Sequence, residues 1–555
     1  MRAWLGIVGC CALSACFQPH NAEGVRVEAR SQAFRFPRLD KVDLLFVVDN
    51  SNSMAGEQAL LRAQFPRLME ALTTGQRNPN DPRPFTPVRD LHVGVVSTDM
   101  GIPGVALPPS CSADGGDDGK LQNQPFSIPG STCESQYPAF LTYDASVDSP
   151  EALARDFSCV ATLGTGGCGF ESQLEAPFKA LMPRILTDAQ GGIVQNPYTF
   201  LATDEVRTRG RGDLPVAQGG NAGFLRQDPK DPSLLVIVLL TDEEDCSVKS
   251  TDHLKPNNQL PEDSPYRAED INLRCHNHPE FLYELRDRYL NGFRALRPGR
   301  EDLVVFSAIA GVPADLVSAE VMAATDLNDE DAREAFYKKI LDDERMEEVV
   351  DPTSMPGMGQ GNLRPSCVRQ VEGESTPSTA YPPRRIVELA RAFGPNGMVQ
   401  SICQDDFGPA VDMIVNSMAK PLTEMCMPQK LIRGDDDKVQ CTLYWELPTE
   451  DQVKEQMLDE NTPTKCTDLP DLLDSRVEVR DSDNGGQRCA IQQLAVERGH
   501  VVSDSEGWYY DDFTDGLDDM CAEGLPRRIA FTERAHAARG VAVTLECEAG
   551  ASEVK

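Results

Sequence analysis

The chain has 555 residues and a formal net charge of −35. This length exceeds that of one ordinary hydrophobic core and predicts two or three domains. Hydrophobic residues make up 40% of the sequence, enough for a packed interior, so the chain as a whole is not predicted to be disordered. The negative charge argues against binding to nucleic acid or to anionic lipid headgroups, because both would be repelled.

The first sixteen residues have the pattern of an export signal. Arg2 supplies a positive charge, and the apolar run at 5–15 is too short to span a bilayer as a helix. Leu13-Ser14-Ala15-Cys16 resembles the lipobox of bacterial lipoproteins in all four positions. That resemblance implies removal of residues 1–15 and lipid attachment to Cys16, whose acyl chains would be the only membrane contact. The alternative is an ordinary secretory signal with an incidental cysteine.

The residues after this signal indicate where the protein is located and how it is attached. Phe17, and not aspartate, follows Cys16, which by resemblance to Gram-negative sorting indicates the outer membrane of the cell envelope. Residues 16–37 are interpreted as a tether between the lipid and the folded protein.

Residues 38–420 alternate between patterns of buried strands and helices. Strands are predicted at 43–49, 91–97, 233–240 and 302–310, and helices at 55–72, 171–186, 279–296, 386–393 and 407–418. This alternation predicts an α/β fold with a doubly wound, mostly parallel sheet covered by helices on both faces. Two insertions, at about 101–158 and 246–278, are expected to interrupt the domain.

Oxygen-bearing side chains follow two of these predicted strands. Asp49, Ser51 and Ser53 form a D-x-S-x-S motif directly after the first strand, and Asp242 closes a later one. In this arrangement residues 38–420 resemble the von Willebrand factor type A (VWA) family. The resemblance implies a MIDAS-type site in which these four residues bind Mg²⁺, or Mn²⁺ or Ca²⁺, at the carboxyl ends of the strands.

The family's fifth ligand is a threonine on an intervening loop. Thr165 is the nearest candidate here, although an alignment anchored on the following helix places Cys168 in that position. Because hydroxyl ligands carry no charge, the ion would be under-neutralised. The resemblance then implies a last ligand from a protein partner, the carboxylate of an aspartate or glutamate. The alternative is a degenerate VWA domain without metal.

Fourteen cysteines follow Cys16, and no two of them form a C-x-x-C pair. Scattered, even-numbered cysteines in an exported chain indicate disulfides and not a zinc site. Proximity in the sequence suggests the pairs Cys111–Cys133, Cys159–Cys168, Cys246–Cys275 and Cys367–Cys403.

The last part of the chain, residues 421–555, differs from the rest in its cysteine content and in its hydrophobic pattern. It contains six cysteines and short alternating runs at 442–445, 476–479, 528–531 and 541–545. Period-two alternation is typical of half-buried antiparallel strands, so a small, disulfide-stapled, β-rich domain is predicted.

Three functions are compatible with these patterns. The favoured one is a surface lipoprotein that binds a protein partner through a metal-bridged carboxylate, and the alternative is a structural envelope component whose VWA-like domain uses no metal. A hydrolase is disfavoured, because G-x-S-x-G is absent and none of the seven histidines stands in a nucleophile motif. His276 and His278 could bind zinc, but no second Cys/His pair accompanies them, and a polar loop is the preferred interpretation.

Overall fold

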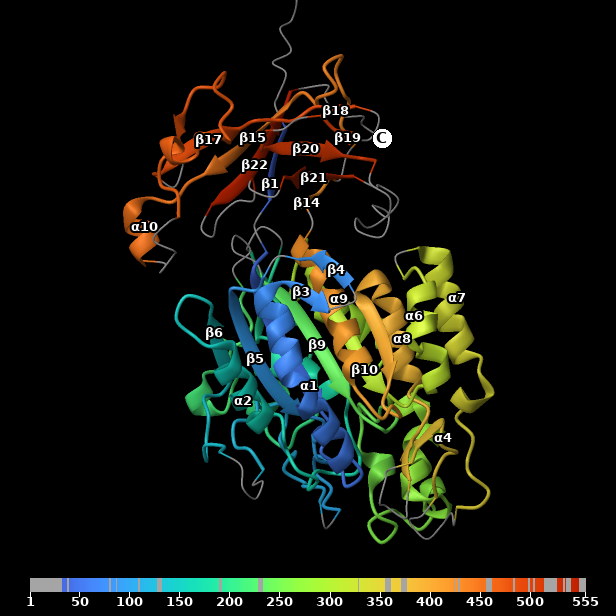
Figure 1. The fold of residues 1–555 in the computed structure, drawn as a ribbon. Coiled ribbons are helices and arrows are strands. Elements are labelled where there is room, and N and C mark those ends of the chain that lie inside the picture. The colour runs from blue at the N-terminus through green and yellow to red at the C-terminus, as the bar shows by residue number, and fades with distance from the viewer. Residues whose placement is uncertain are drawn as a thin grey trace, which may run out of the picture.

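The computed structural model describes most of the chain from residue 32 onward. The described residues are 32–36, 39–78, 81–85, 87–107, 110–126, 132–188, 192–227, 233–327, 329–354, 361–370, 377–423, 425–427, 430–455, 462–482, 485–497, 500–502, 505–513, 527–532, 535 and 541–548. Cys16, the signal at 1–15 and most of the tether at 16–37 lie outside them. The described residues form a large α/β domain and a group of small antiparallel sheets beyond one end of it (Figure 1).

A six-stranded sheet is the centre of the α/β domain. Its strand order is β13-β10-β9-β2-β5-β6, and every neighbouring pair is parallel except β5 and β6. The strands are β2 (Lys41–Val48), β5 (Asp90–Ser97), β6 (Leu141–Asp144), β9 (Leu234–Leu240), β10 (Val304–Ala310) and β13 (Gly397–Ser401). The predicted α/β class with a mostly parallel sheet is confirmed.

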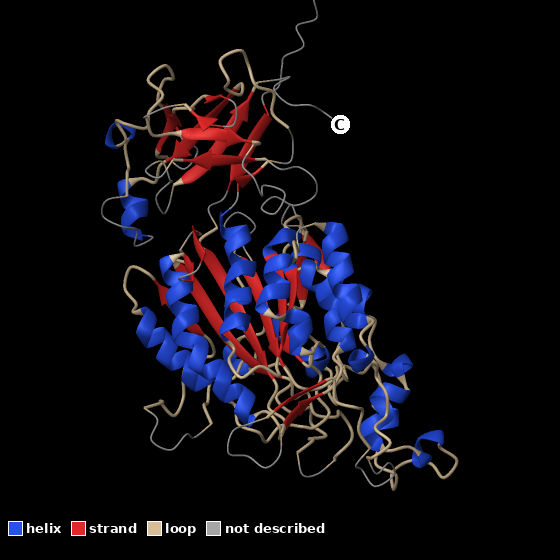
Figure 2. Cartoon of the chain, turned by 45° about the vertical axis from the view of Figure 1, so that its right-hand side comes forward, coloured by secondary structure: helices blue, strands red, loops and turns tan. Residues whose placement is uncertain are grey.

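Helices cover both faces of this sheet (Figure 2). In β2, Leu44 and Phe46 belong to one hydrophobic core and Leu45 and Val47 to the other, and all four are fully buried. This double burial explains why the strand is continuously apolar from Leu44 to Val48. The first core includes α1 (Ala55–Thr74), α2 (Pro150–Val160) and α9 (Gly408–Thr423); the second includes α3 (Glu175–Leu181), α5 (Asn291–Arg294), α7 (Glu330–Leu341) and α8 (Arg384–Ala392).

Short hairpins and helices connect the main elements of the α/β domain. Three hairpins pair β3 (Gln76–Asn78) with β4 (Asp81–Pro84), β7 (Ile185–Thr187) with β8 (Ile193–Gln195), and β11 (Cys367–Arg369) with β12 (Ser378–Ala380). The remaining short α-helices of the domain are α4 (Arg274–Asn277) and α6 (Ala319–Ala324), while α10 (Glu450–Glu455) lies in the C-terminal part (Figure 1).

Antiparallel sheets make up the C-terminal part, as the alternating runs predict. Their strands are β14 (Met425–Cys426), β15 (Cys441–Glu446), β16 (Arg480–Asp481), β17 (Gln487–Ile491), β18 (Val496–Glu497), β19 (His500–Val501), β20 (Trp508–Asp511), β21 (Arg528–Phe531) and β22 (Ala542–Cys547). The strand expected at 476–479 is not formed, and β16 begins just after it. β1 (Gln32–Phe36) pairs with β22, so the end of the expected tether belongs to the C-terminal sheet.

Six disulfides join described residues, and two of the four predicted pairings are correct. Cys246–Cys275 and Cys367–Cys403 are present. The pairings Cys111–Cys133 and Cys159–Cys168 are wrong, because the bonds are Cys111–Cys168 and Cys133–Cys159. The reason is long-range packing: α2 lies beside β6 and brings Cys159 to Cys133, while Cys168 returns to the strand ends where Cys111 lies.

The other two described disulfides, Cys441–Cys547 and Cys466–Cys489, fasten the C-terminal sheets. Several disulfides in one chain are typical of exported proteins. Across the residues that the structure describes, no helix has the length and apolar character needed to cross a membrane.

Candidate functional site

The candidate site lies where the strand order of the central sheet reverses. From β2, the chain first adds β5 and β6 on one side and then crosses to add β9, β10 and β13 on the other. Loops that leave neighbouring strands in opposite directions open a crevice at their carboxyl ends, which is where open α/β sheets bind ligands. Asp49 follows β2 and Asp242 follows β9 at this point, on the end of the sheet away from the C-terminal strands (Figure 1).

Asp49 is the centre of a short hydrogen-bonded loop. Its backbone N–H donates to the carbonyl of Leu240 at 3.0 Å, which fixes the loop against the end of β9. Its fully buried carboxylate accepts from the backbone N–H of Ser51 at 2.8 Å and from the Thr241 hydroxyl at 2.6 Å. The Ser51 and Ser53 hydroxyl oxygens lie 3.2 Å apart. The structure therefore brings the whole D-x-S-x-S motif together beside Thr241.

Asp242 joins the same group with an unsatisfied oxygen. The residue is 2% exposed, and its Oδ1 has no hydrogen-bond partner. Burial raises the pKa of Asp242 to about 9, with the charges of Glu243 and Asp49 adding to it, while a hydrogen bond from Ser53 acts in the opposite direction. Burial likewise raises the pKa of Glu243 to about 8. Carboxylates so placed need either protons or a cation.

Glu171 is a third buried carboxylate that the sequence did not single out. It is 3% exposed, and its Oε1 has no hydrogen-bond partner. Burial raises the pKa of Glu171 well above its usual value, and the next largest causes are the negative charges of Asp49 and Glu243. The sequence pattern predicts a helix from residue 171, but helix α3 begins only at Glu175. Glu171 therefore lies on the loop, near the two aspartates.

Gln58 on α1 connects the Asp49 loop to the loop that carries Glu171. Its Nε2 donates to the carbonyls of Asp49 and Gly164, each at 2.9 Å. The backbone N–H of Gly167 donates to the carbonyl of Asn50 at 2.9 Å. A Cβ on Gly167 would lie 2.1 Å from Asn50 Oδ1, so glycine permits this close approach.

Of the two sequence candidates for the fifth ligand, the structure excludes Cys168, and Thr165 stays a prediction. Thr165 is half-buried and lies on the loop whose Gly164 and Gly167 are hydrogen-bonded to Gln58 and Asn50, although no hydrogen bond in the described part of the chain joins it directly to the aspartates or serines of the site. Cys168 is bonded to Cys111 and offers no free thiol. On the same loop, three positions after Cys168, Glu171 has a pKa that is raised by burial and, in addition, by the negative charges of Asp49 and Asp242.

The donor set fits a hard divalent cation. Three carboxylates and two serine hydroxyls supply oxygen ligands of the kind that Mg²⁺, Ca²⁺ and Mn²⁺ prefer. Oxygens of Asp242 and Glu171 lack donors, and no described Lys or Arg forms an ion pair with Asp49, Glu171 or Asp242. Ser53 is exposed, so the group is reached from solvent on that side.

The sequence matches no protein-family profile, and no curated protein is significantly similar to it. Among solved structures, one similar chain is the pilus adhesin RrgA from Streptococcus pneumoniae, at 12% identity and a TM-score of 0.17. That alignment covers 93% of this chain but only 57% of the adhesin. A likeness this weak carries no information about fold or function.

Proposed function

We propose that this chain is an exported, lipid-anchored envelope protein whose VWA-like domain binds a protein partner through a divalent cation. Asp49, Ser51, Ser53 and Asp242 would hold the ion, with Mg²⁺ the first choice and Mn²⁺ or Ca²⁺ as alternatives. The observation that carries the proposal is the buried Oδ1 of Asp242, an acceptor without a donor beside Asp49 at the strand-order reversal. The exposed Ser53 marks the side from which a partner's carboxylate would reach the ion.

A second candidate function follows from Glu171. Two aspartates and two hydroxyls leave room for one more anionic ligand, and in this chain the candidate is Glu171, a buried carboxylate whose pKa is raised by burial and then by the charge of Asp49. The cation would then be neutralised within the domain and would act as a structural staple in an envelope component. The two functions differ in whether one coordination position remains open to an outside carboxylate.

Metal binding is tested first by calorimetry. We expect Mg²⁺ to bind the mature chain at one site. Loss of an outer-shell partner weakens metal binding roughly 10–100-fold, and Asp49→Ala should weaken it by more, because it removes a direct ligand. Asp263→Asn, an exposed change on the 246–275 loop, serves as the matched control and should leave binding unchanged. Absence of any heat with Mg²⁺, Mn²⁺ or Ca²⁺ in the parent chain would rule out both candidate functions.

The open position is tested with Mn²⁺ in place of Mg²⁺. Partner binding requires an open coordination position, which a rapidly exchanging water occupies in the absence of the partner. This water is detected as enhanced water-proton relaxation, and a short glutamate-containing peptide should displace it. Relaxation that is weak in the parent chain and rises in Glu171→Gln would instead favour the structural staple, with Glu171 occupying that position.

Lipid anchoring is tested separately, because Cys16 lies outside the described residues. We expect the parent chain, expressed in a Gram-negative host, to fractionate with the outer membrane and to be extracted by detergent. Cys16→Ser removes the thiol that would carry the lipid. If the variant stays in the membrane fraction as fully as the parent, the lipobox interpretation is wrong.

A further inference from the structure

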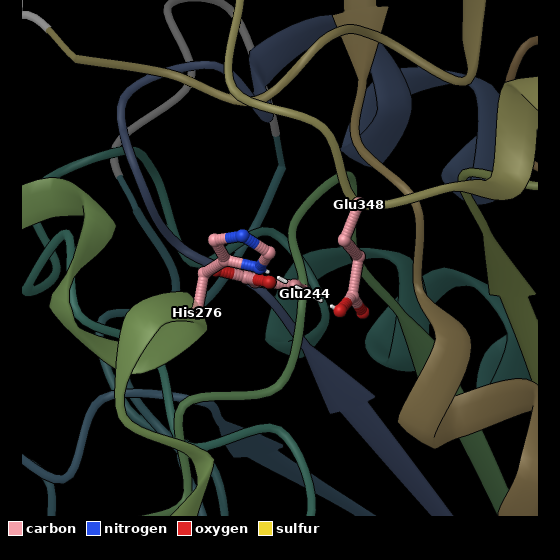
Figure 3. Close-up of side chains that lie close together, drawn as sticks. All are labelled: Glu244, His276 and Glu348. Carbon is pink, nitrogen blue, oxygen red and sulfur yellow. Dashed lines mark ion pairs between the residues drawn. The ribbon is translucent and has the colours of Figure 1, made fainter.

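A second group of metal-ligand side chains lies beside the first, on three segments far apart in the sequence. Glu244 follows β9, His276 lies on α4, and Glu348 lies on the connection between α7 and α8. One potential ligand atom from each lies within 4.8 Å of the other two, and Figure 3 shows the imidazole and both carboxylates directed toward one another. All three residues are partly buried.

The backbone around this group is fixed by strong local restraints. Glu244 precedes Cys246 by two residues and His276 directly follows Cys275, so the Cys246–Cys275 disulfide holds both of them at one place. On the third segment, the backbone N–H of Arg364 donates to the carbonyl of Val349 at 2.8 Å, immediately after Glu348. Restrained segments hold ligands in place at little cost in conformational entropy when a ligand binds.

His276 and Glu348 form an ion pair, but the group has no hydrogen bond at the imidazole nitrogen that faces it. His276 Nδ1 is buried without a hydrogen-bond partner, and it lies 3.6 Å from Glu348 Oε2, too far for a hydrogen bond. Ligand atoms around a tetrahedral Zn²⁺ ion stand about 3.4 Å apart, given metal–ligand bonds of about 2.0–2.1 Å. Among the described residues, no Lys or Arg forms an ion pair with Glu244 or Glu348.

The neighbouring His278 provides the contrast. Its Nε2 lies 2.8 Å from Glu269 and its Nδ1 lies 3.1 Å from Glu280, so both ring nitrogens already have carboxylate partners. Of the two histidines that flank Asn277, only His276 has a ring nitrogen directed into a group of carboxylates without a hydrogen bond.

We propose that Glu244, His276 and Glu348 form a second cation site, specific for a divalent transition metal such as Zn²⁺. An imidazole nitrogen favours such ions over Mg²⁺ and Ca²⁺, which prefer oxygen ligands only. Three protein ligands leave a fourth position for water or a small anion. A cavity of about 120 Å³ is lined by Glu244 of this site together with Glu171 and Glu243.

Such an ion would join three parts of the α/β domain. It would tie the loop after β9 to the disulfide-closed insertion and to the α7–α8 connection. This site goes beyond the proposed partner binding and does not depend on it, because none of its three ligands belongs to the first site.

The test is a Zn²⁺ titration of the full mature chain in saturating Mg²⁺, followed by competition with a chromophoric chelator. We expect one Zn²⁺ equivalent in the parent chain and at least about tenfold weaker binding in both His276→Gln and Glu348→Gln. His278→Gln is the matched histidine control, and Asp49→Ala tests the first site; both should bind Zn²⁺ like the parent.

Three results would overturn the proposal. They are no Zn²⁺ binding by the parent chain, equal binding by the parent and Glu348→Gln, and loss of binding in Asp49→Ala instead. The last result would place the zinc in the first site. Glu348 lies on a connection outside both hydrophobic cores, so its variant keeps the test valid even if His276→Gln fails to fold.

Discussion

Replacing Asp242 by asparagine should abolish the stabilisation by Mg²⁺ and yet raise the melting temperature of the metal-free protein. Without a cation, the buried carboxyl at this position has a pKa of about 9, chiefly because of burial. Its ionised form is therefore unfavourable in the folded state, and asparagine removes that charge while keeping the shape. In the parent chain, Mg²⁺ at 100 times its Kd should add about 2.7 kcal/mol to the free energy of unfolding.

The pH dependence of this effect has a definite sign. Because the carboxyl pKa is higher in the folded than in the unfolded chain, the folded state binds the additional proton between pH of about 4 and about 9. The stability of the metal-free protein should therefore fall as pH rises through this window. The fall should be smaller in Asp242→Asn, and Mg²⁺ should reduce it in the parent chain.

Thermal unfolding in chelator and in Mg²⁺, at pH 5, 7 and 8.5, measures both effects. Asp263→Asn should follow the parent chain throughout, since this side chain is exposed. A metal-free Asp242→Asn variant that melts below the parent at pH 8.5 would show that the ionised carboxylate is stabilised by some group other than a cation.

The central strands could be predicted because a strand that is buried on both faces has apolar side chains at consecutive positions. β2 and β9 are apolar at nearly every position, and the structure places both inside the sheet. The pattern does not predict β13 (Gly397–Ser401), since this strand is short and three of its five residues are small or polar. The helix expected at 279–296 forms only from Leu285, as a π-helix at Leu285–Leu290 that continues into the short α5, with Arg288 bound to the buried Glu175.

Part of the candidate site could also be predicted from the sequence, and part could not. Asp49 and Asp242 each follow a recognisable strand, so their meeting depends only on strand pairing, which the alternation of strands and helices implies. Glu171 could not be placed, because the path of its loop is set by Gln58 and by the Cys111–Cys168 bond, neither of which is local in sequence. The same holds for Glu348, which reaches His276 only through tertiary packing.

Replacing Asp43 by asparagine should destabilise the α/β domain more than any surface change. Asp43 is fully buried at the start of β2, and its carboxylate binds Arg297 at 3.0 Å and the Ser233 hydroxyl at 2.6 Å. It also forms an ion pair with Arg226. Removing one partner of a buried ion pair leaves uncompensated charge and costs about 3–5 kcal/mol.

Chemical denaturation of the α/β domain, followed by far-ultraviolet circular dichroism, measures this cost. The matched control is Asp302→Asn, which breaks the exposed pair with Arg300 and should change the free energy of unfolding by no more than about 1 kcal/mol. Because Arg297 also donates to the Ser233 carbonyl at 2.8 Å, the double variant Asp43→Asn with Arg297→Met should recover part of the loss. Equal destabilisation by Asp43→Asn and Asp302→Asn would mean that Arg226 and Arg297 find solvent or other acceptors, and that the buried carboxylate does not hold β2 to its neighbours.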